Sequence, residues 1–144
     1  SDFIQVSLAA SASQLDEVPV GAVIVKGQRI IGAAHNLCQQ LRDPTAHAEM
    51  LAITQAAEAV GDWRLEDCVL YATLEPCPMC AGATIMSRMR IVHYSFNDPK
   101  MGGLGGATSL HELEMSNHKP TITKGIMEEE SKILVQAFFQ SQRK

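Results

Sequence analysis

Two short motifs rich in metal-ligating residue types each open a predicted helix, and one predicted strand separates the two helices. The first motif is Thr45-Ala46-His47-Ala48-Glu49, and the second is Glu75-Pro76-Cys77-Pro78-Met79-Cys80. Strong helix formers over residues 46–60, followed by Gly61 as a stop, predict the first helix. Pro78 suits the first position of a helix over residues 78–89, because its missing N–H costs nothing there.

The rest of the chain continues this alternation of strands and helices. The predicted elements are a helix at 3–15, a hairpin of strands 18–25 and 29–36, strands at 68–74, 91–96 and 121–126, a glycine-rich loop at 101–110, and a closing helix at 128–140. Strands that alternate with helices favour a sheet covered on both faces. We therefore expect an α/β fold with three α/β/α layers around a central five-stranded mixed sheet.

Length and composition limit the domain organisation and the class of partner. A chain of 144 residues with 46% hydrophobic and 19% charged residues fits one domain, residues 1–144, with a real core. It contains no apolar run of about 18 residues and no secretory signal pattern, so we expect a cytoplasmic protein without a membrane span. The net charge of −4 argues against binding nucleic acid over the whole surface but leaves room for a local contact.

The residue types in the two motifs are typical of a catalytic zinc site. His47, Cys77 and Cys80 offer an imidazole and two thiolates, which are ligands that zinc prefers, and two cysteines three residues apart lie on one side of a turn. The positive end of the helix dipole favours their thiolate forms. Three protein ligands leave a fourth position for water, whose pKa zinc lowers toward about 7. Glu49 is then free to carry protons as general acid and base.

Other interpretations of these residues are open at this point. An H-x-E triplet is a weak signal by itself, so His47 can be a surface histidine beside two inert thiols. A thioredoxin-like redox pair is another interpretation of C-x-x-C, but it leaves His47 and Glu49 without a role. We expect Cys38 and Cys68 to be buried thiols rather than further ligands. The methionines of the 78–89 helix, Met79, Met86 and Met89, are expected in the core or in a subunit contact.

With these motifs the chain resembles the cytidine-deaminase-like superfamily, and within it the tRNA-specific adenosine deaminases. The pattern H-x-E…P-C-x-x-C is the known signature of zinc-dependent base deaminases. The resemblance covers about residues 16–140. It rests on the stretches 16–23, 43–49 and 74–83, on Asn36, and on Asp98-Pro99-Lys100 with the glycines that follow. The Asp-Pro-Lys stretch and Phe138-Phe139 are typical of the tRNA-editing branch.

This resemblance implies a cytidine-deaminase-like fold and a function. One zinc ion per subunit would be held by His47, Cys77 and Cys80, and Glu49 would shuttle protons while the wobble adenosine of a tRNA anticodon loop is hydrolysed to inosine. Asn36 would hydrogen-bond the nucleoside, and the backbone near Ala48 and Pro76 would line the base pocket. RNA contacts are expected from Asp98, Lys100, Phe139 and Arg143. Relatives of this type build each active site beside a neighbouring subunit, which implies a homodimer.

Two rival functions remain compatible with the same residues. A deaminase of a free base or nucleoside, of the guanine or cytosine type, would use the same zinc apparatus. A non-catalytic zinc-binding subunit that only positions RNA is the second rival, but such relatives typically replace the glutamate that stands here as Glu49. Ammonia release from different substrates would separate the first rival from a tRNA deaminase.

Overall fold

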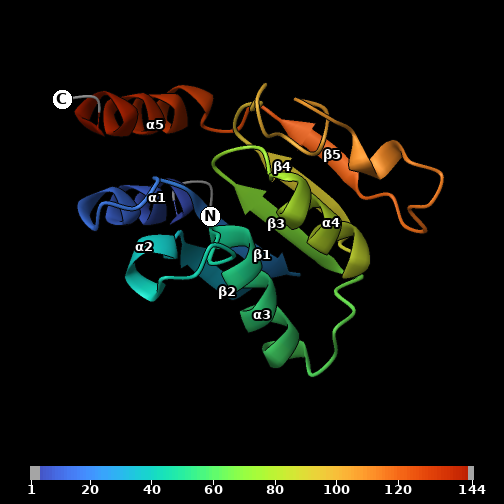
Figure 1. The fold of residues 1–144 in the computed structure, drawn as a ribbon. Coiled ribbons are helices and arrows are strands. Elements are labelled where there is room, and N and C mark those ends of the chain that lie inside the picture. Colours follow the sequence, from blue (N-terminus) through green and yellow to red (C-terminus); the bar gives the residue numbers. More distant parts are fainter. Residues whose placement is uncertain (1–3, 143–144) are drawn as a thin grey trace.

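The computed structural model describes residues 4–142 (Figure 1). Its elements are α1 (Ile4–Gln14), β1 (Gly21–Lys26), β2 (Arg29–His35), α2 (Cys38–Leu41), α3 (Ala48–Val60), β3 (Cys68–Ala72), α4 (Pro78–Met86), β4 (Ile91–Tyr94), the 3-10 helix η1 (Leu110–Glu112), β5 (Thr121–Lys124) and α5 (Glu128–Gln142). No helix in this part of the chain is both long enough and apolar enough to cross a membrane.

The five strands form one mixed sheet in the order β2-β1-β3-β4-β5. The predicted hairpin is confirmed: β1 pairs antiparallel with β2 and also with β3, whereas β3, β4 and β5 run parallel. A register shift next to Ile24 marks a bulge in the hairpin. Strands β3 and β4 are parallel, so the chain has to cross from the end of β3 back to the start of β4, and α4 forms this crossover. The start of α4 therefore follows shortly after the C-terminal end of β3.

Two glycines identify the helices on the two faces of the sheet. A Cβ atom on Gly21 would overlap the backbone of α1, and a Cβ atom on Gly32 would overlap the backbone of α3 at Ala52. Gly32 is paired with Ile24, three residues from Gly21 along β1, so the two glycines face opposite sides of the pleat. The helices α1 and α3 therefore cover opposite faces, which confirms the three-layer prediction.

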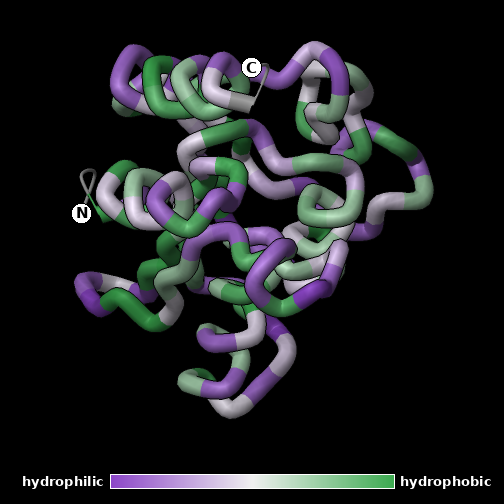
Figure 2. The backbone as a smooth tube through the Cα atoms, turned by 60° about the vertical axis from the view of Figure 1, so that its left-hand side comes forward, coloured by the Kyte–Doolittle hydropathy of each residue, from purple (hydrophilic) through white to green (hydrophobic). Residues whose placement is uncertain are grey.

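Helices α4 and α5 join these two layers. In Figure 1, α4 lies beside α3, and α5 lies along α1. The core on the α3 side is built largely from small residues of α3 and from branched residues of the strands: Ala48, Ala52, Ala56, Ile24, Leu70 and Val92 are all buried. Hydrophilic and hydrophobic residues alternate along α5 (Figure 2), which matches a helix with one face on the protein and one in solvent.

Several predicted boundaries were wrong for identifiable reasons. The first strand starts at Gly21 rather than 18, because Val18 to Val20 forms a tight turn with Val20 N donating to Val18 O over 2.8 Å. The helix predicted to end at 89 ends at Met86, and Arg88 adopts a left-handed conformation with φ 64°. The last strand ends at Lys124, where Gly125 has φ 103°. The closing helix runs on to Gln142.

Candidate functional site

His47 lies at the N-cap of α3, with φ −75° and ψ 150°. The helix therefore starts two residues later than predicted, because the extended backbone of His47 stands just before the first helical residue. Asn36, the residue after β2, stabilises this start: its side-chain oxygen accepts the backbone N–H of Ala48 over 2.7 Å. The backbone N–H of Asn36 in turn donates to Val20 O over 3.1 Å. The sheet edge thus fixes the position of His47 and of Glu49 in the first turn.

Cys77 occupies the corresponding position on α4. It is the N-cap residue with extended backbone, φ −67° and ψ 173°, and Pro78 is the first helical residue, as predicted. Cys80 is buried in the first turn of the helix. Both metal-ligating motifs therefore stand at helix N-termini, where the positive end of each dipole stabilises negative charge.

These two helix starts bring three ligand atoms together. The Nδ1 atom of His47 lies 3.5 Å from the sulfur of Cys77 and 3.5 Å from the sulfur of Cys80. The three ligand atoms all lie within 4.8 Å of one another. His47 is 30 and 33 positions from Cys77 and Cys80 in the sequence, so the fold, and not local spacing, brings the imidazole to the cysteine pair. An imidazole nitrogen and two sulfurs at this separation can hold a metal ion.

The electrostatics of the cluster follow from its hydrogen bonds. The Cys80 thiol donates to Cys77, which lowers the pKa of Cys77 to about 4 and raises the pKa of Cys80. The hydrogen bond with Cys77 also raises the pKa of His47 above its usual value, against the effect of burial. One thiolate is therefore present at neutral pH before any cation binds, as a ligand site requires.

Glu49 is the buried acid beside this cluster. Its side chain is only 3% exposed, and burial raises its pKa to about 7, partly offset by hydrogen bonding to its carboxylate and by the charge of His47. Its Oε1 atom is buried and accepts no hydrogen bond from residues 4–142. A buried carboxylate oxygen without a partner is costly, and such a group at a ligand cluster is typical of a functional site. The oxygen is available for a water molecule or a substrate proton.

The predicted nucleoside-binding residues adjoin the cluster. Asn36 is buried, and its oxygen is occupied by Ala48, so its amide nitrogen is the atom that can donate to another group. Ala48 is fully buried at the start of α3. Pro76 precedes Cys77, and its carbonyl accepts the N–H of Gly103 over 2.8 Å. Ala48 and Pro76 are therefore direct neighbours of a ligand residue in the sequence, and Asn36 is hydrogen-bonded to Ala48.

The predicted RNA-contacting residues lie on two separate segments. Asp98 is half-buried just before the glycine-rich loop, and its Oδ1 atom accepts the backbone N–H groups of Lys100 and Met101 over 3.0 and 3.2 Å. The Lys100 side chain is exposed. Phe139 is 45% exposed on α5 and makes an edge contact with Phe138. Arg143 lies outside the described residues.

Sequence reasoning missed two buried carboxylates near the site. Glu75 accepts four N–H groups of residues 97–106, and Glu17 accepts the backbone N–H groups of Gln39 and Gln40 over 3.0 and 2.7 Å. Both stand in motif stretches, but the donors are 22 or more residues away. For Glu75 the available signal was the glycine-rich loop that follows, since glycines allow backbone to approach a side chain closely.

The other cysteines lie outside the cluster, as predicted. Cys68 is buried at the start of β3, whereas Cys38 is only half-buried, so the burial expected for Cys38 was wrong. Its place on the short helix α2, which the sequence analysis did not predict, explains the exposure, because none of the four residues of α2 is buried.

Comparisons with known proteins agree with this geometry. A model of the MafB19-like deaminase family matches residues 4–143. The chain is 46% identical to a tRNA-specific adenosine deaminase of Bacillus subtilis (strain 168), over 94% of this chain and 84% of that protein. A solved structure from a study of A-to-I editing by tRNA:A34 deaminases at the wobble position superposes with a TM-score of 0.89 at 40% identity, covering 91% and 95% of the two chains. A guanine deaminase of Bacillus subtilis gives a TM-score of 0.63 at 32% identity, covering 96% and 88%.

Proposed function

The chain belongs to the tRNA-specific adenosine deaminases, with the cytidine-deaminase-like fold of that family, and from this premise we propose that it deaminates the wobble adenosine of a tRNA anticodon loop to inosine. The observation that carries the deamination chemistry is the buried Glu49 oxygen, which accepts no hydrogen bond from residues 4–142 and lies beside the three ligand atoms, and the similarity to the tRNA-specific relatives supports tRNA as the substrate. An unpaired anticodon base is cheaply turned out of its stack, so it can reach a buried site of this kind.

We propose zinc as the metal, one ion per subunit, held by His47, Cys77 and Cys80. In a tetrahedral zinc site with bonds of about 2.3 Å to sulfur and about 2.0 Å to nitrogen, a nitrogen ligand and a sulfur ligand lie about 3.5 Å apart. The 3.5 Å separations between the His47 nitrogen and both sulfurs fit this requirement. When bound, zinc would supply a water molecule of lowered pKa as the nucleophile.

Glu49 would act as the proton carrier of the reaction. Its pKa of about 7 lets the carboxyl group exist in both protonation states near neutral pH, so it can accept a proton and release it again. The two acceptors in the substrate would be the ring nitrogen next to C6 and the departing amine. Because Glu49 follows His47 by two residues at the start of α3, its carboxylate stays close to the ligands without being one of them.

Asn36 would orient the nucleoside. Since Ala48 N–H occupies its oxygen, the amide would donate its nitrogen hydrogens to an acceptor oxygen of the nucleotide. The backbone near Ala48 and Pro76 would line the base pocket. Asp98, Lys100, Phe139 and Arg143 are proposed to contact RNA: Lys100 is an exposed cation, and the exposed ring of Phe139 suits stacking on a base.

We further propose that two copies of the chain associate through the C-terminal end of α4. A groove of about 930 Å³ lies there, lined by apolar side chains that include Ile53, Trp63, Met86, Leu110, Leu113 and Met115. Met86 is 75% exposed and Met115 is 82% exposed. Large apolar residues that gather around one groove are unusual on a monomer surface and support a subunit contact. The same helix carries Cys80 in its first turn, so the partner would pack on a helix that also holds a ligand.

The test is the reaction itself. The purified zinc-loaded protein is incubated with total tRNA, with guanine, cytosine and cytidine, and ammonia release is measured. Treated tRNA is digested and searched for inosine at the wobble position by mass spectrometry. Inosine in tRNA, without ammonia from the free bases, is the expected result. Ammonia from guanine or cytosine with unchanged tRNA would favour the free-base alternative, which the weaker match to the guanine deaminase does not support.

A further inference from the structure

Glu75 is a buried carboxylate that the proposed reaction does not use. It stands two residues before Cys77 and is 2% exposed. We propose that Glu75 is a positioning residue: it holds the loop of residues 97–106, here called the glycine loop, in the conformation that presents Asp98 and Lys100 to RNA. The part of this inference that concerns RNA rests on the proposed function.

The carboxylate of Glu75 is saturated with donors from the glycine loop. Oε1 accepts the side-chain N–H of Asn97 over 2.8 Å and the backbone N–H of Asp98 over 2.9 Å. Oε2 accepts the backbone N–H groups of Leu104 and Gly106, each over 2.8 Å. An ionised carboxylate has two oxygens that each accept two hydrogen bonds and donate none. Each oxygen of Glu75 therefore accepts two N–H groups, and the loop supplies all four.

The loop closes directly on this carboxylate. A Cβ atom on Gly102 or on Gly106 would overlap the Glu75 carboxyl group. Two of the glycines are thus required by the approach of the backbone to a side chain and not by a turn alone. The loop backbone lies against the carboxylate, so Glu75 is the acceptor on which these loop hydrogen bonds depend.

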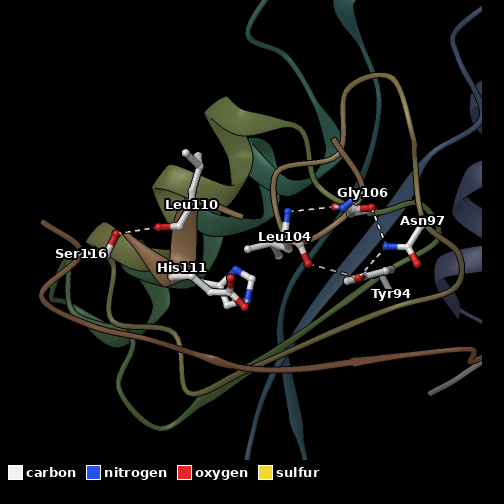
Figure 3. A network of polar contacts seen from close by, with 9 residues as sticks. Tyr94, Asn97, Leu104, Gly106, Leu110, His111 and Ser116 are labelled. Atoms are coloured by element: carbon white, nitrogen blue, oxygen red, sulfur yellow. Dashed lines mark hydrogen bonds and ion pairs between the residues drawn. The ribbon is translucent and has the colours of Figure 1, made fainter. Parts of the chain in front are cut away.

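Further contacts join the glycine loop to the segment that carries the ligands. Gly103 N donates to Pro76 O over 2.8 Å, and Glu75 N donates to Phe96 O over 3.0 Å. Figure 3 shows the Tyr94 hydroxyl between the Asn97 amide and the Leu104 carbonyl, at 2.9 and 3.4 Å. The loop is thereby attached to both β4 and the turn before α4.

A short chain of hydrogen bonds connects the buried carboxylate to the exposed cation. Glu75 fixes the backbone N–H of Asp98, and the Asp98 side chain accepts the backbone N–H of Lys100 over 3.0 Å. Lys100 is exposed, so its side chain is free to reach a phosphate. Loss of the Glu75 contacts would release the loop and scatter the position of Lys100 without touching His47, Cys77, Cys80 or Glu49.

The test uses Glu75→Gln in the full chain with zinc bound. The substitution keeps the volume but turns one acceptor oxygen into an NH₂ donor. At the Oε2 position this group would face the N–H groups of Leu104 and Gly106. At the Oε1 position the new NH₂ group would face the backbone N–H of Asp98 and the side-chain NH₂ of Asn97. If the Asn97 amide flipped to avoid this clash of donors, its NH₂ would point at Lys124 Nζ, which in the wild type donates to Asn97 Oδ1 over 3.0 Å. Neither placement satisfies the loop.

Three quantities are measured: zinc content, steady-state kinetics on a 17-nucleotide anticodon stem-loop, and amide hydrogen exchange. We expect unchanged zinc, a KM about tenfold higher with kcat within threefold, and exchange at least tenfold faster at Leu104 and Gly106 but not in β3. The control Ile24→Val trims the buried core of β1 and removes no polar contact. An unchanged KM, an equal KM increase in the control, or a loss in kcat alone would overturn the assignment.

A milder variant covers the case in which Glu75→Gln does not fold. Asn97→Ala removes one of the four donors from a half-buried position, and we expect a KM increase of about threefold. An unchanged KM in that variant would also reject the assignment. If the wild-type protein does not deaminate the stem-loop, the proposed function fails instead. The exchange rates of Leu104 and Gly106 then still decide whether Glu75 holds the loop.

Discussion

Glu49 combines two properties that rarely occur together, a fully buried carboxylate and an oxygen that accepts no hydrogen bond within residues 4–142. If it carries protons, Glu49→Ala should bind zinc as the wild type does yet lose about 10²- to 10⁴-fold in kcat, the range typical of general acid–base catalysis. Inosine formation and metal content by elemental mass spectrometry measure the two effects. The matched control is Glu58→Ala, an exposed glutamate on the same helix, which should keep full activity. Full turnover in Glu49→Ala would remove it from the chemistry.

The sequence predicted which three residues gather in the ligand cluster, but it did not predict the partners of the buried carboxylates. His47, Cys77 and Cys80 were predictable because the residue type and a spacing of three positions already define a ligand pair, and the fold brings the three together. Glu75 was not, although it stands in the same motif. Its four donors lie 22 to 31 residues away, and only the packing of the glycine loop aims them at one carboxylate.

The elements position the ligands at the starts of two helices, so a bound metal would tie α3 to α4. Zinc at about a hundred times its dissociation constant stabilises the folded chain by about 2.7 kcal/mol, which corresponds to a rise of roughly 8 °C in Tm for a chain of this size. We expect a chelator to remove this increment in a thermal melt. Cys80→Ser should show no zinc-dependent shift, and Cys38→Ser, outside the cluster, should keep it. A shift that survives in Cys80→Ser would place the metal elsewhere.

At this scale the sequence predicted the order of strands and helices but not every boundary. The long elements were found because their apolar and helix-forming runs are continuous. Helix α2 was missed because it has four residues and depends on Glu17, whose carboxylate accepts N–H groups of Gln39 and Gln40. Such a helix is stabilised by a tertiary contact and not by its own propensity.

The charge of the whole molecule limits how it can bind RNA. With a net charge of −4, affinity has to come from a few local cations, of which Lys100 is proposed to be one. Each phosphate contact to a single strand contributes about 0.7 to the slope of log affinity against log salt. Lys100→Ala should therefore reduce that slope by about 0.7 in stem-loop binding measured by fluorescence anisotropy. The control is Lys26→Ala, since Lys26 pairs with Cys68 at the opposite end of β3 from the ligands. An unchanged slope in Lys100→Ala would exclude a phosphate contact.

The groove at the C-terminal end of α4 leads to a prediction about the oligomeric state. Met86 and Met115 expose most of their apolar surface around one depression, which is the arrangement expected of a contact that a second copy covers. The sequence predicted Met86 either in the core or in a subunit contact and did not distinguish the two. Sedimentation should give twice the monomer mass for the wild type, and Met86→Asp should weaken association at least about thirtyfold by placing a charge in an apolar contact. Ile133→Asp, equally apolar and 61% exposed but on α5, is the control and should remain dimeric. Were Met86→Asp to sediment as the wild type does, the second copy would have to bind another face, and the groove on α4 would lose its role.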